Sequence, residues 1–204
     1  MTIRNPEGHV TRRTALATSA LLLPFTPAAV LAKEEALVKP LDVPYVPTQM
    51  PTVRKMLDMG GVGKKDTLYD LGCGDGRIVV TAAKERGARG VGIDLNPQRI
   101  TEANQNAKEA RVTDRVKFMV GDLFAANFAP ATVVTLYLLP EVNLRLRPQL
   151  WRQLKAGTRV VSHAFDMGPE WPPEDTQTVG SSTIYRWTIK PEHKMAAARW
   201  FHLG

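Results

Sequence analysis

The sequence predicts an α/β fold in which a mostly parallel sheet ends in an antiparallel hairpin. From Leu68 onward, short apolar runs of the kind found in buried strands alternate with longer amphipathic runs of helical period. A turn that holds three glycines, residues 72–76, joins the first strand to the helix that follows it. Near the C-terminus, two β-rich runs within residues 176–189 flank Gly180, which predicts the hairpin.

Residues 1–32 form a predicted twin-arginine export signal. The pair Arg12-Arg13 precedes an apolar stretch that runs to Ala32, and the charged Lys33 follows. A charged start, an apolar middle and small residues at the end are the parts of an export signal, and paired arginines are the address of the twin-arginine pathway. We therefore expect an exported, periplasmic protein, or a cytoplasmic one if the segment is only an N-terminal tail.

Residues 33–50 form a predicted extended arm, because proline recurs in it and restricts the backbone. A helix begins after it at Pro51, a favourable first-turn residue, and Gly60 ends that helix. Two polar residues of the arm, Tyr45 and Thr48, have two interpretations. They either pack the arm onto the fold or form a lid over a ligand pocket.

The glycine turn predicts a nucleotide-type cradle at the carboxyl edge of the sheet. Glycine permits backbone angles that other residues avoid and lets the main chain approach a ligand closely. The helix after the turn presents unpaired N–H groups to the loop. The spacing over residues 72–76 is Gly-x-Gly-x-Gly, preceded by Asp70, whereas a dinucleotide fingerprint requires Gly-x-Gly-x-x-Gly. This spacing disfavours a nicotinamide-binding oxidoreductase, which is the rival enzyme class.

Two later strands lead into acids. The strand over residues 90–94 ends in Asp94, twenty residues after Gly74, the distance at which an acid reaches ribose hydroxyls in nucleotide-binding α/β folds. The alternative for Asp94 is a cap on the next helix, but Asn96 already supplies one. The strand over residues 116–120 leads into Asp122. The remaining predicted elements are helices over residues 77–86, 97–111 and 141–154, the last interrupted at Pro148, and strands over residues 131–137 and 158–163.

The composition is that of an ordinary globular protein with an excess of basic residues. The net charge is +7 and the isoelectric point is near 9.7, but no long run of Lys or Arg appears, so an evenly solvated basic surface is the simplest interpretation. The single cysteine, Cys73, excludes an internal disulfide and is expected to be a small buried filler. The four histidines match no metal-ligand spacing, so no metal site is expected.

The stretch from Asp70 to Val79, Asp-Leu-Gly-Cys-Gly-Asp-Gly-Arg-Ile-Val, resembles the first motif of the class I S-adenosylmethionine-dependent methyltransferases. Together with residues 44–48 and 137–143, it is similar to the small lysine methyltransferases of the ATP synthase c-subunit and adenine nucleotide translocase family and their bacterial relatives. The resemblance implies a Rossmann-like, seven-stranded, mostly parallel sheet with helices on both faces. We expect the methyltransferase domain to span residues 51–190, and residues 191–204 to be a C-terminal tail without an assigned role.

The same resemblance implies the cofactor and the residues that hold it. The cofactor is S-adenosyl-L-methionine. Its methionine end would lie against Asp70, Gly72 and Gly74, its ribose against Asp94, and its adenine against Asp122 and the backbone of Leu123. Methyl transfer from a sulfonium requires alignment and exclusion of water rather than a metal or a nucleophilic side chain.

The acceptor implied by the resemblance is a protein lysine, and we expect its protein to lie at or near a membrane. The candidate catalytic residues are Tyr137 and Glu141, in a pocket that Tyr45, Leu138, Pro140 and Asn143 complete. An alternative for Glu141 is a first-turn acid that stabilises a helix dipole. No nucleic-acid substrate is expected, because residues 138–141 lack the Asn/Asp-Pro-Pro-aromatic motif expected of an amino-methylating nucleic-acid enzyme. A small-molecule methyltransferase and a non-catalytic exported binding protein remain alternatives.

Overall fold

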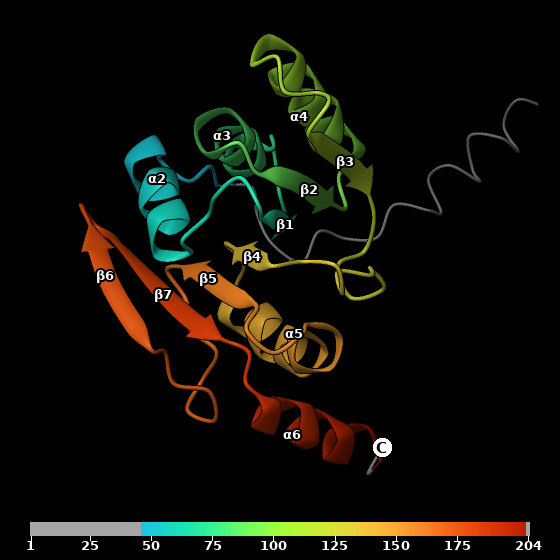
Figure 1. Ribbon diagram of the computed structural model, residues 1–204, viewed down its shortest axis with the longest axis vertical. Helices are drawn as coiled ribbons and strands as arrows, with labels where there is room; N and C mark the ends of the chain where they lie inside the picture. Colours follow the sequence, from blue (N-terminus) through green and yellow to red (C-terminus); the bar gives the residue numbers. More distant parts are fainter. Residues whose placement is uncertain (1–45, 203–204) are drawn as a thin grey trace, which may run out of the picture. The chain divides into compact units, whose positions relative to one another are not determined.

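The computed structural model describes residues 46–202, which form a seven-stranded sheet covered by helices (Figure 1). The strand order is β3-β2-β1-β4-β5-β7-β6. Strands β1 to β5 pair in parallel, and β7 lies antiparallel between β5 and β6. The strands are β1 (Thr67–Leu71), β2 (Arg89–Asp94), β3 (Val116–Val120), β4 (Val133–Leu136), β5 (Arg159–His163), β6 (Asp175–Val179) and β7 (Ser182–Thr188). The predicted fold class is confirmed. The predicted export signal and most of the predicted arm, including Tyr45, lie outside the described residues.

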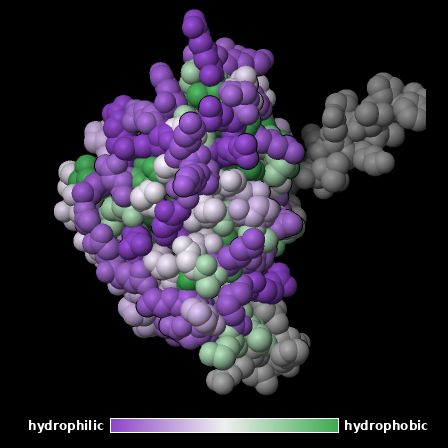
Figure 2. All heavy atoms as spheres, viewed as in Figure 1, coloured by the Kyte–Doolittle hydropathy of each residue, from purple (hydrophilic) through white to green (hydrophobic). Residues whose placement is uncertain are grey.

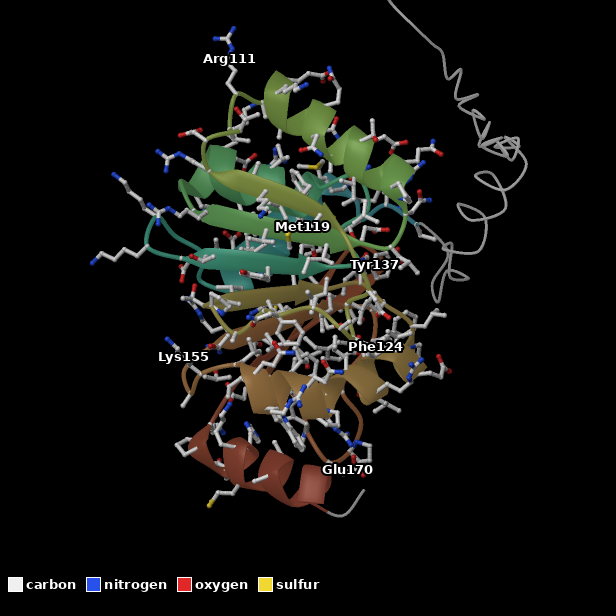
Figure 3. All side chains as sticks on the ribbon, turned by 90° about the vertical axis from the view of Figure 1, so that its right-hand side faces the viewer. Arg111, Met119, Phe124, Tyr137, Lys155 and Glu170 are labelled. Atoms are coloured by element: carbon white, nitrogen blue, oxygen red, sulfur yellow. The ribbon has the colours of Figure 1, made fainter. Side chains whose placement is uncertain are left out.

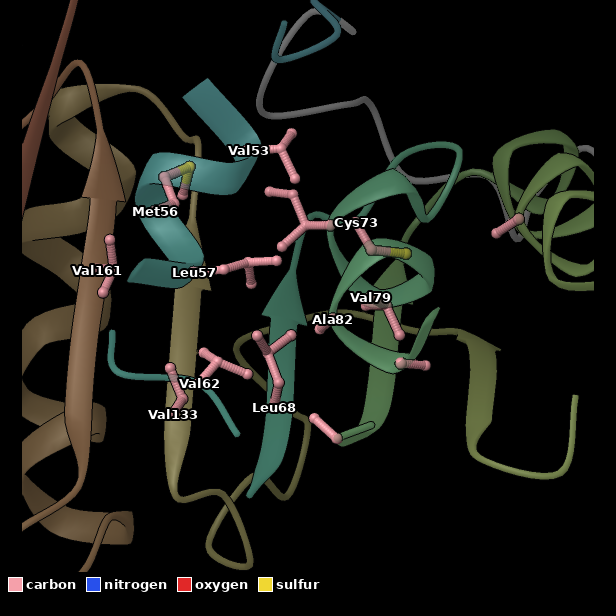
Figure 4. Packing of buried hydrophobic residues seen from close by; sticks show 14 of the residues in the cluster. Val53, Met56, Leu57, Val62, Leu68, Cys73, Val79, Ala82, Val133 and Val161 are labelled. Carbon is pink, nitrogen blue, oxygen red and sulfur yellow. The ribbon is translucent and has the colours of Figure 1, made fainter. Parts of the chain in front are cut away.

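Helices cover both faces of the sheet, because successive residues of its strands point to opposite sides. Val133 of β4 lies beside Val62 in Figure 4, in a hydrophobic cluster that includes residues of α2 and α3, whereas its neighbour Val134 belongs to a second cluster with α5. Val161 and Val160 of β5 divide between the two clusters in the same way. The described helices are α2 (Met50–Met59), α3 (Arg77–Arg86), α4 (Pro97–Glu109), α5 (Pro140–Gln153) and α6 (Pro191–His202). None of them is long and apolar enough to cross a membrane.

Helix α5 continues through Pro148, where an interruption is predicted from the sequence. Proline removes the hydrogen bond to the carbonyl four residues earlier, that of Leu144. Leu146 and Leu150, on either side of the proline, are fully buried, and Pro148 is buried with them. Packing of the buried face keeps α5 in one piece.

Residues 191–202, which have no role in the sequence-based prediction, form helix α6 on the C-terminal end of α5. The ammonium of Lys194 donates to the carbonyl oxygens of Trp151, Arg152 and Leu154 at 2.7, 2.7 and 2.6 Å. These carbonyls end α5, where no backbone N–H of the helix can reach them. The His193 ring stacks on Trp151 with a centroid distance of 5.3 Å. Helix α6 therefore caps α5 electrostatically and packs against it.

The face of the molecule shown in Figure 2 is mainly hydrophilic, with small separated hydrophobic patches. This distribution agrees with an ordinary solvated surface on that face.

Candidate active site

The glycine turn after β1 is held against the end of β2. The backbone N–H groups of Gly72 and Cys73 both donate to the carbonyl of Ile93, at 2.8 and 3.0 Å. Gly72 has a φ of +80°, and a Cβ on it would lie 2.7 Å from Leu138 Cδ2. Glycine is required there for two reasons, the left-handed backbone and the close approach of Leu138.

A cavity of about 290 Å³ opens beside this turn, at the carboxyl ends of the parallel strands. Figure 3 shows Tyr137 and Phe124 at the edge toward which these strands point, and Lys155 at the opposite edge. All six residues predicted to bind the cofactor line the cavity: Asp70, Gly72, Gly74, Asp94, Asp122 and Leu123. Their individual roles toward the cofactor stay predictions, but the structure brings them together in one pocket.

Asp70 is the most buried acid of the pocket, with 2% of its surface exposed. Burial, together with the negative charges of Asp94 and Asp75, raises the pKa of Asp70 to about 7, although a hydrogen bond from Thr135 opposes the shift. In that bond the Thr135 hydroxyl donates to Asp70 Oδ1 at 2.7 Å. A positively charged ligand group would favour the ionised form of Asp70.

Asp94 connects the glycine turn to the loop after β2. Its Oδ2 accepts from the N–H of Gly74 at 2.8 Å and its Oδ1 accepts from the N–H of Asn96 at 2.9 Å. Helix α4 is capped by Asn96 itself, whose Oδ1 accepts from the N–H of Gln98 at 2.9 Å. Each carboxylate oxygen has a second lone pair, so Asp94 retains acceptors for vicinal hydroxyls.

Asp122 and Leu123 stand where β3 ends. The Oδ1 of Asp122 accepts from the N–H of Phe124 at 2.9 Å, which closes a local turn, and both Asp122 and Leu123 line the cavity. These are the two residues predicted to bind the adenine.

The two predicted catalytic residues occupy different environments. Tyr137 lines the cavity, whereas Glu141 is an exposed residue in the first turn of α5 and is not among the lining residues. Pro140 is likewise exposed and outside the lining. Asn143 is fully buried, and its amide donates to the Phe165 carbonyl at 3.1 Å, so it shapes the cavity indirectly.

Cys73 is a buried member of the hydrophobic core, as predicted, with 5% of its surface exposed. A Cβ on Gly92 would lie 2.8 Å from its Sγ, so the thiol fills space under the turn. Burial and the nearby carboxylates of Asp70 and Asp94 raise the pKa of the Cys73 thiol far above its usual value.

Sequence reasoning missed three residues around the pocket: Arg77, His163 and Phe165. The Arg77 guanidinium donates to the carbonyl of Thr48 at 3.0 Å. Phe165 lines the cavity, and the ring of His163 lies against Tyr137. Arg77 stands within the motif of residues 70–79, which does not reveal its contact with Thr48. His163 and Phe165 belong to no motif, and the hydrogen-bond partner of His163 lies 115 residues earlier in the sequence.

The residues present fit S-adenosylmethionine. The glycine turn leaves room for a ligand against the backbone, a buried carboxyl can face the α-amino cation, and Asp94 has acceptors for the ribose. Ile78, Leu138 and Leu139 form an apolar wall that can pack against the aliphatic part of the ligand.

Comparisons with known proteins agree with this assignment. A sequence model of the family described as "ANTKMT methyltransferase domain" matches residues 70–175. A "Protein-lysine N-methyltransferase" of Saccharolobus islandicus (strain REY15A) is 45% identical over 157 residues, 74% of this chain and 96% of that protein. A human lysine N-methyltransferase named for the ATP synthase c-subunit is 32% identical over 84% of this chain and 69% of its own length.

A solved structure shows the same fold with a bound product. The crystal structure of an "RNA methyltransferase from Salinibacter ruber in complex with S-Adenosyl-L-homocysteine" is 56% identical, has a TM-score of 0.70, and covers 72% of this chain and 95% of that one. The family match and these relatives, on a chain whose pocket fits the cofactor, lead to one conclusion. The protein is an S-adenosylmethionine-dependent methyltransferase and belongs to the ANTKMT methyltransferase domain family.

Proposed function

We propose that this protein methylates the ε-amine of a lysine in a protein substrate. The observation that carries the proposal is the wall of the pocket beyond β4, where Tyr137, Leu138 and Phe165 place apolar and aromatic surface in the same cavity as Asp70 and the other pocket acids. The names of the Saccharolobus and human relatives, both lysine N-methyltransferases, support it.

The apolar wall has a direct chemical use. S-adenosylmethionine, when bound, supplies a methyl group that its sulfonium already activates for displacement. A lysine attacks only after it has lost a proton, and apolar surroundings lower the pKa of an ammonium by penalising its charge. The chain therefore has to align the amine, exclude water and favour the neutral form, which Tyr137, Leu138 and Phe165 can do.

Glu141 is our candidate for attracting the ammonium before it enters the pocket. It is exposed at the start of α5, two residues after Leu139 of the cavity wall. From there it can receive the proton through water. If its role is only to stabilise the α5 dipole, Glu141→Gln will lower the free energy of unfolding by a few tenths of a kcal/mol and leave methylation unchanged.

Methylation of RNA is the second candidate function, favoured by the similarity to the Salinibacter ruber protein, which is described as an RNA methyltransferase. Against it, Leu138-Leu139-Pro140-Glu141 after β4 lacks the motif expected of an amino-methylating nucleic-acid enzyme. The two functions differ in the molecule that receives the methyl group.

The test is transfer of a labelled methyl group from S-adenosylmethionine to an extract of the source cells by the full chain. Label that protease removes and nuclease spares, with methyl-lysine in the acid hydrolysate, supports the lysine proposal. Label lost to nuclease overturns it and supports RNA methylation. Asp94→Ala serves as the control, because its carboxylate is predicted to bind the ribose, so label should fall in either case when the cofactor is not saturating.

We further propose that residues 1–32 direct export by the twin-arginine pathway and that the protein substrate lies at or near the membrane. Twin-arginine export carries folded proteins, so the enzyme could be exported with its cofactor bound. Repeated turnover outside the cytoplasm would need a supply of S-adenosylmethionine there. Fractionation of cells that carry the native chain decides the location.

A further inference from the structure

Three side chains from distant parts of the chain meet beside the cavity. Thr48 precedes α2, Tyr137 follows β4, and His163 ends β5. The Oγ1 of Thr48 and the Nδ1 of His163 are 3.2 Å apart, a hydrogen bond in which the ring tautomer determines the donor. The rings of His163 and Tyr137 lie with centroids 3.9 Å apart at an interplanar angle of 33°. Thr48 and Tyr137 line the cavity, whereas His163 contacts both of them without being a lining residue itself.

The segment before α2 is held at two points. On one side, the Thr48 hydroxyl pairs with His163 of β5. On the other side, the Thr48 carbonyl accepts a hydrogen bond from Arg77, whose guanidinium also forms an ion pair with Asp75 of the glycine turn at 2.6 Å. Because Val46 and Pro47 also line the cavity, this attachment fixes one of its walls.

His163 is itself fixed by the loop that follows it. The next residue, Ala164, has a φ of +69°, a left-handed conformation that is strained in a residue other than glycine. The loop is stabilised in this shape by hydrogen bonds to the carbonyl of Phe165, from the Ser162 hydroxyl at 2.6 Å and the Asn143 amide at 3.1 Å. His163 is 6% exposed, so its ring has little freedom to move.

We propose that His163 is a positioning residue for methyl transfer: it orients Tyr137 by ring contact and holds Thr48 by a hydrogen bond. These two residues would thereby form a fixed passage through which the acceptor amine reaches the methyl group. The inference rests on the proposed transfer to an amine. In-line displacement depends steeply on alignment, so a loosened passage should slow the transfer step more than it weakens cofactor binding.

The hydrogen bond between His163 and Thr48 can be removed from either side while the ring contact with Tyr137 stays. His163→Phe keeps a ring against Tyr137 and removes the hydrogen bond to Thr48, and Thr48→Val removes the same bond from the other partner. Thr48→Ser keeps the hydroxyl and should restore the wild-type behaviour. Thr81→Val is the matched control, because Thr81 is a similarly buried threonine, 6% exposed, on α3 and outside the cavity lining.

Three measurements test the proposal on the full chain. We expect His163→Phe and Thr48→Val each to slow single-turnover methyl transfer about tenfold, and the double variant to be no slower than either, because all three lack one shared bond. The dissociation constant for S-adenosylmethionine, measured by calorimetry, should change by less than about threefold. Hydrogen exchange of the backbone amides around Thr48 should accelerate in the cofactor-free variants and stay normal in Thr48→Ser and Thr81→Val.

Multiplicative effects in the double variant, or unchanged exchange around Thr48 in folded His163→Phe, would overturn the positioning role. If the proposed function fails instead, the wild-type chain will not methylate lysine, while the exchange and calorimetry still report on the contact between His163 and Thr48.

Discussion

Binding of S-adenosylmethionine should weaken as the pH falls below 7, and Asp70 should cause that dependence. This carboxyl lines the cavity at the predicted position of the methionine end, where the ligand has an α-amino cation. Burial raises the pKa of Asp70 to about 7, so a large part of the cofactor-free protein has this group protonated and neutral at neutral pH. Only the ionised form offers a charged partner to the cation.

The size of the effect follows from the ionised fraction. With a pKa of about 7, Asp70 is about 50% ionised at pH 7, about 9% at pH 6 and about 1% at pH 5. If the cofactor binds the ionised form, its dissociation constant should rise about fivefold from pH 7 to pH 6 and about ninefold more to pH 5. The α-amino group of the ligand stays protonated across this range, since such groups titrate at about 7.7–8.0.

Calorimetric titration with S-adenosylmethionine at pH 5, 6 and 7 measures this slope. Asp70→Asn should bind weakly and with little pH dependence, whereas Asp58→Asn, which changes a half-exposed acid on α2, should keep the wild-type slope. A flat response in the wild type, or the full slope in Asp70→Asn, would refute the reasoning.

The stability of the cofactor-free protein should have the opposite pH dependence to cofactor binding, because the folded state holds the Asp70 proton more tightly than the unfolded chain does. The free energy of unfolding in urea should therefore fall as the pH rises from about 4 to about 7, and less so in Asp70→Asn.

Three further predictions follow from contacts or motifs already described. Asp94→Ala should weaken S-adenosylmethionine binding by roughly 1–3 kcal/mol, and unchanged calorimetric affinity in a folded variant would exclude the ribose assignment. Gly76→Ala should lower the free energy of unfolding in urea by about 2–5 kcal/mol, because φ is +73° and the added Cβ would lie 2.6 Å from Phe118. Gly157→Ala, also at positive φ but in open space, should cost only about 1–2 kcal/mol, and equal losses would contradict the steric argument. Replacing Arg12 and Arg13 by Lys should retain the precursor in the cytoplasm, and a wild-type protein that fractionates there uncleaved would show that the segment is a tail.

The sequence predicts the fold well where local pattern decides structure. The apolar runs around Leu68, Ile93 and Val134 each become a buried strand, and the glycine turn and Asp94 meet at one cavity because the carboxyl ends of parallel strands share an edge. The interruption predicted at Pro148 is wrong, because the prediction considered only the local effect of proline on a helix. Packing of the buried residues around Pro148 keeps the helix continuous.

The unpredicted features depend on contacts between distant segments. His163 looks in the sequence like the last residue of a strand, and its significance comes from Thr48 and Tyr137, which lie 115 and 26 residues earlier. Lys194 of helix α6 donates to a carbonyl at the end of α5, and the short amphipathic pattern of residues 191–202 does not predict this contact. Hydrophobic periodicity shows which face of a helix or strand is buried, but it does not show which residues of other elements pack against that face.

The rate at which Cys73 reacts with a thiol reagent can report on opening of the glycine turn. It is the chain's single cysteine, it lines the cavity, and its thiol is buried with a strongly raised pKa. The thiolate is the form that attacks an alkylating reagent, so modification requires an opening of the turn that admits both water and the reagent. The rate of maleimide labelling, followed as a single mass increment on the intact chain, would then measure how often the turn opens, without any engineered probe. A ligand that occupies the cavity should lower this labelling rate.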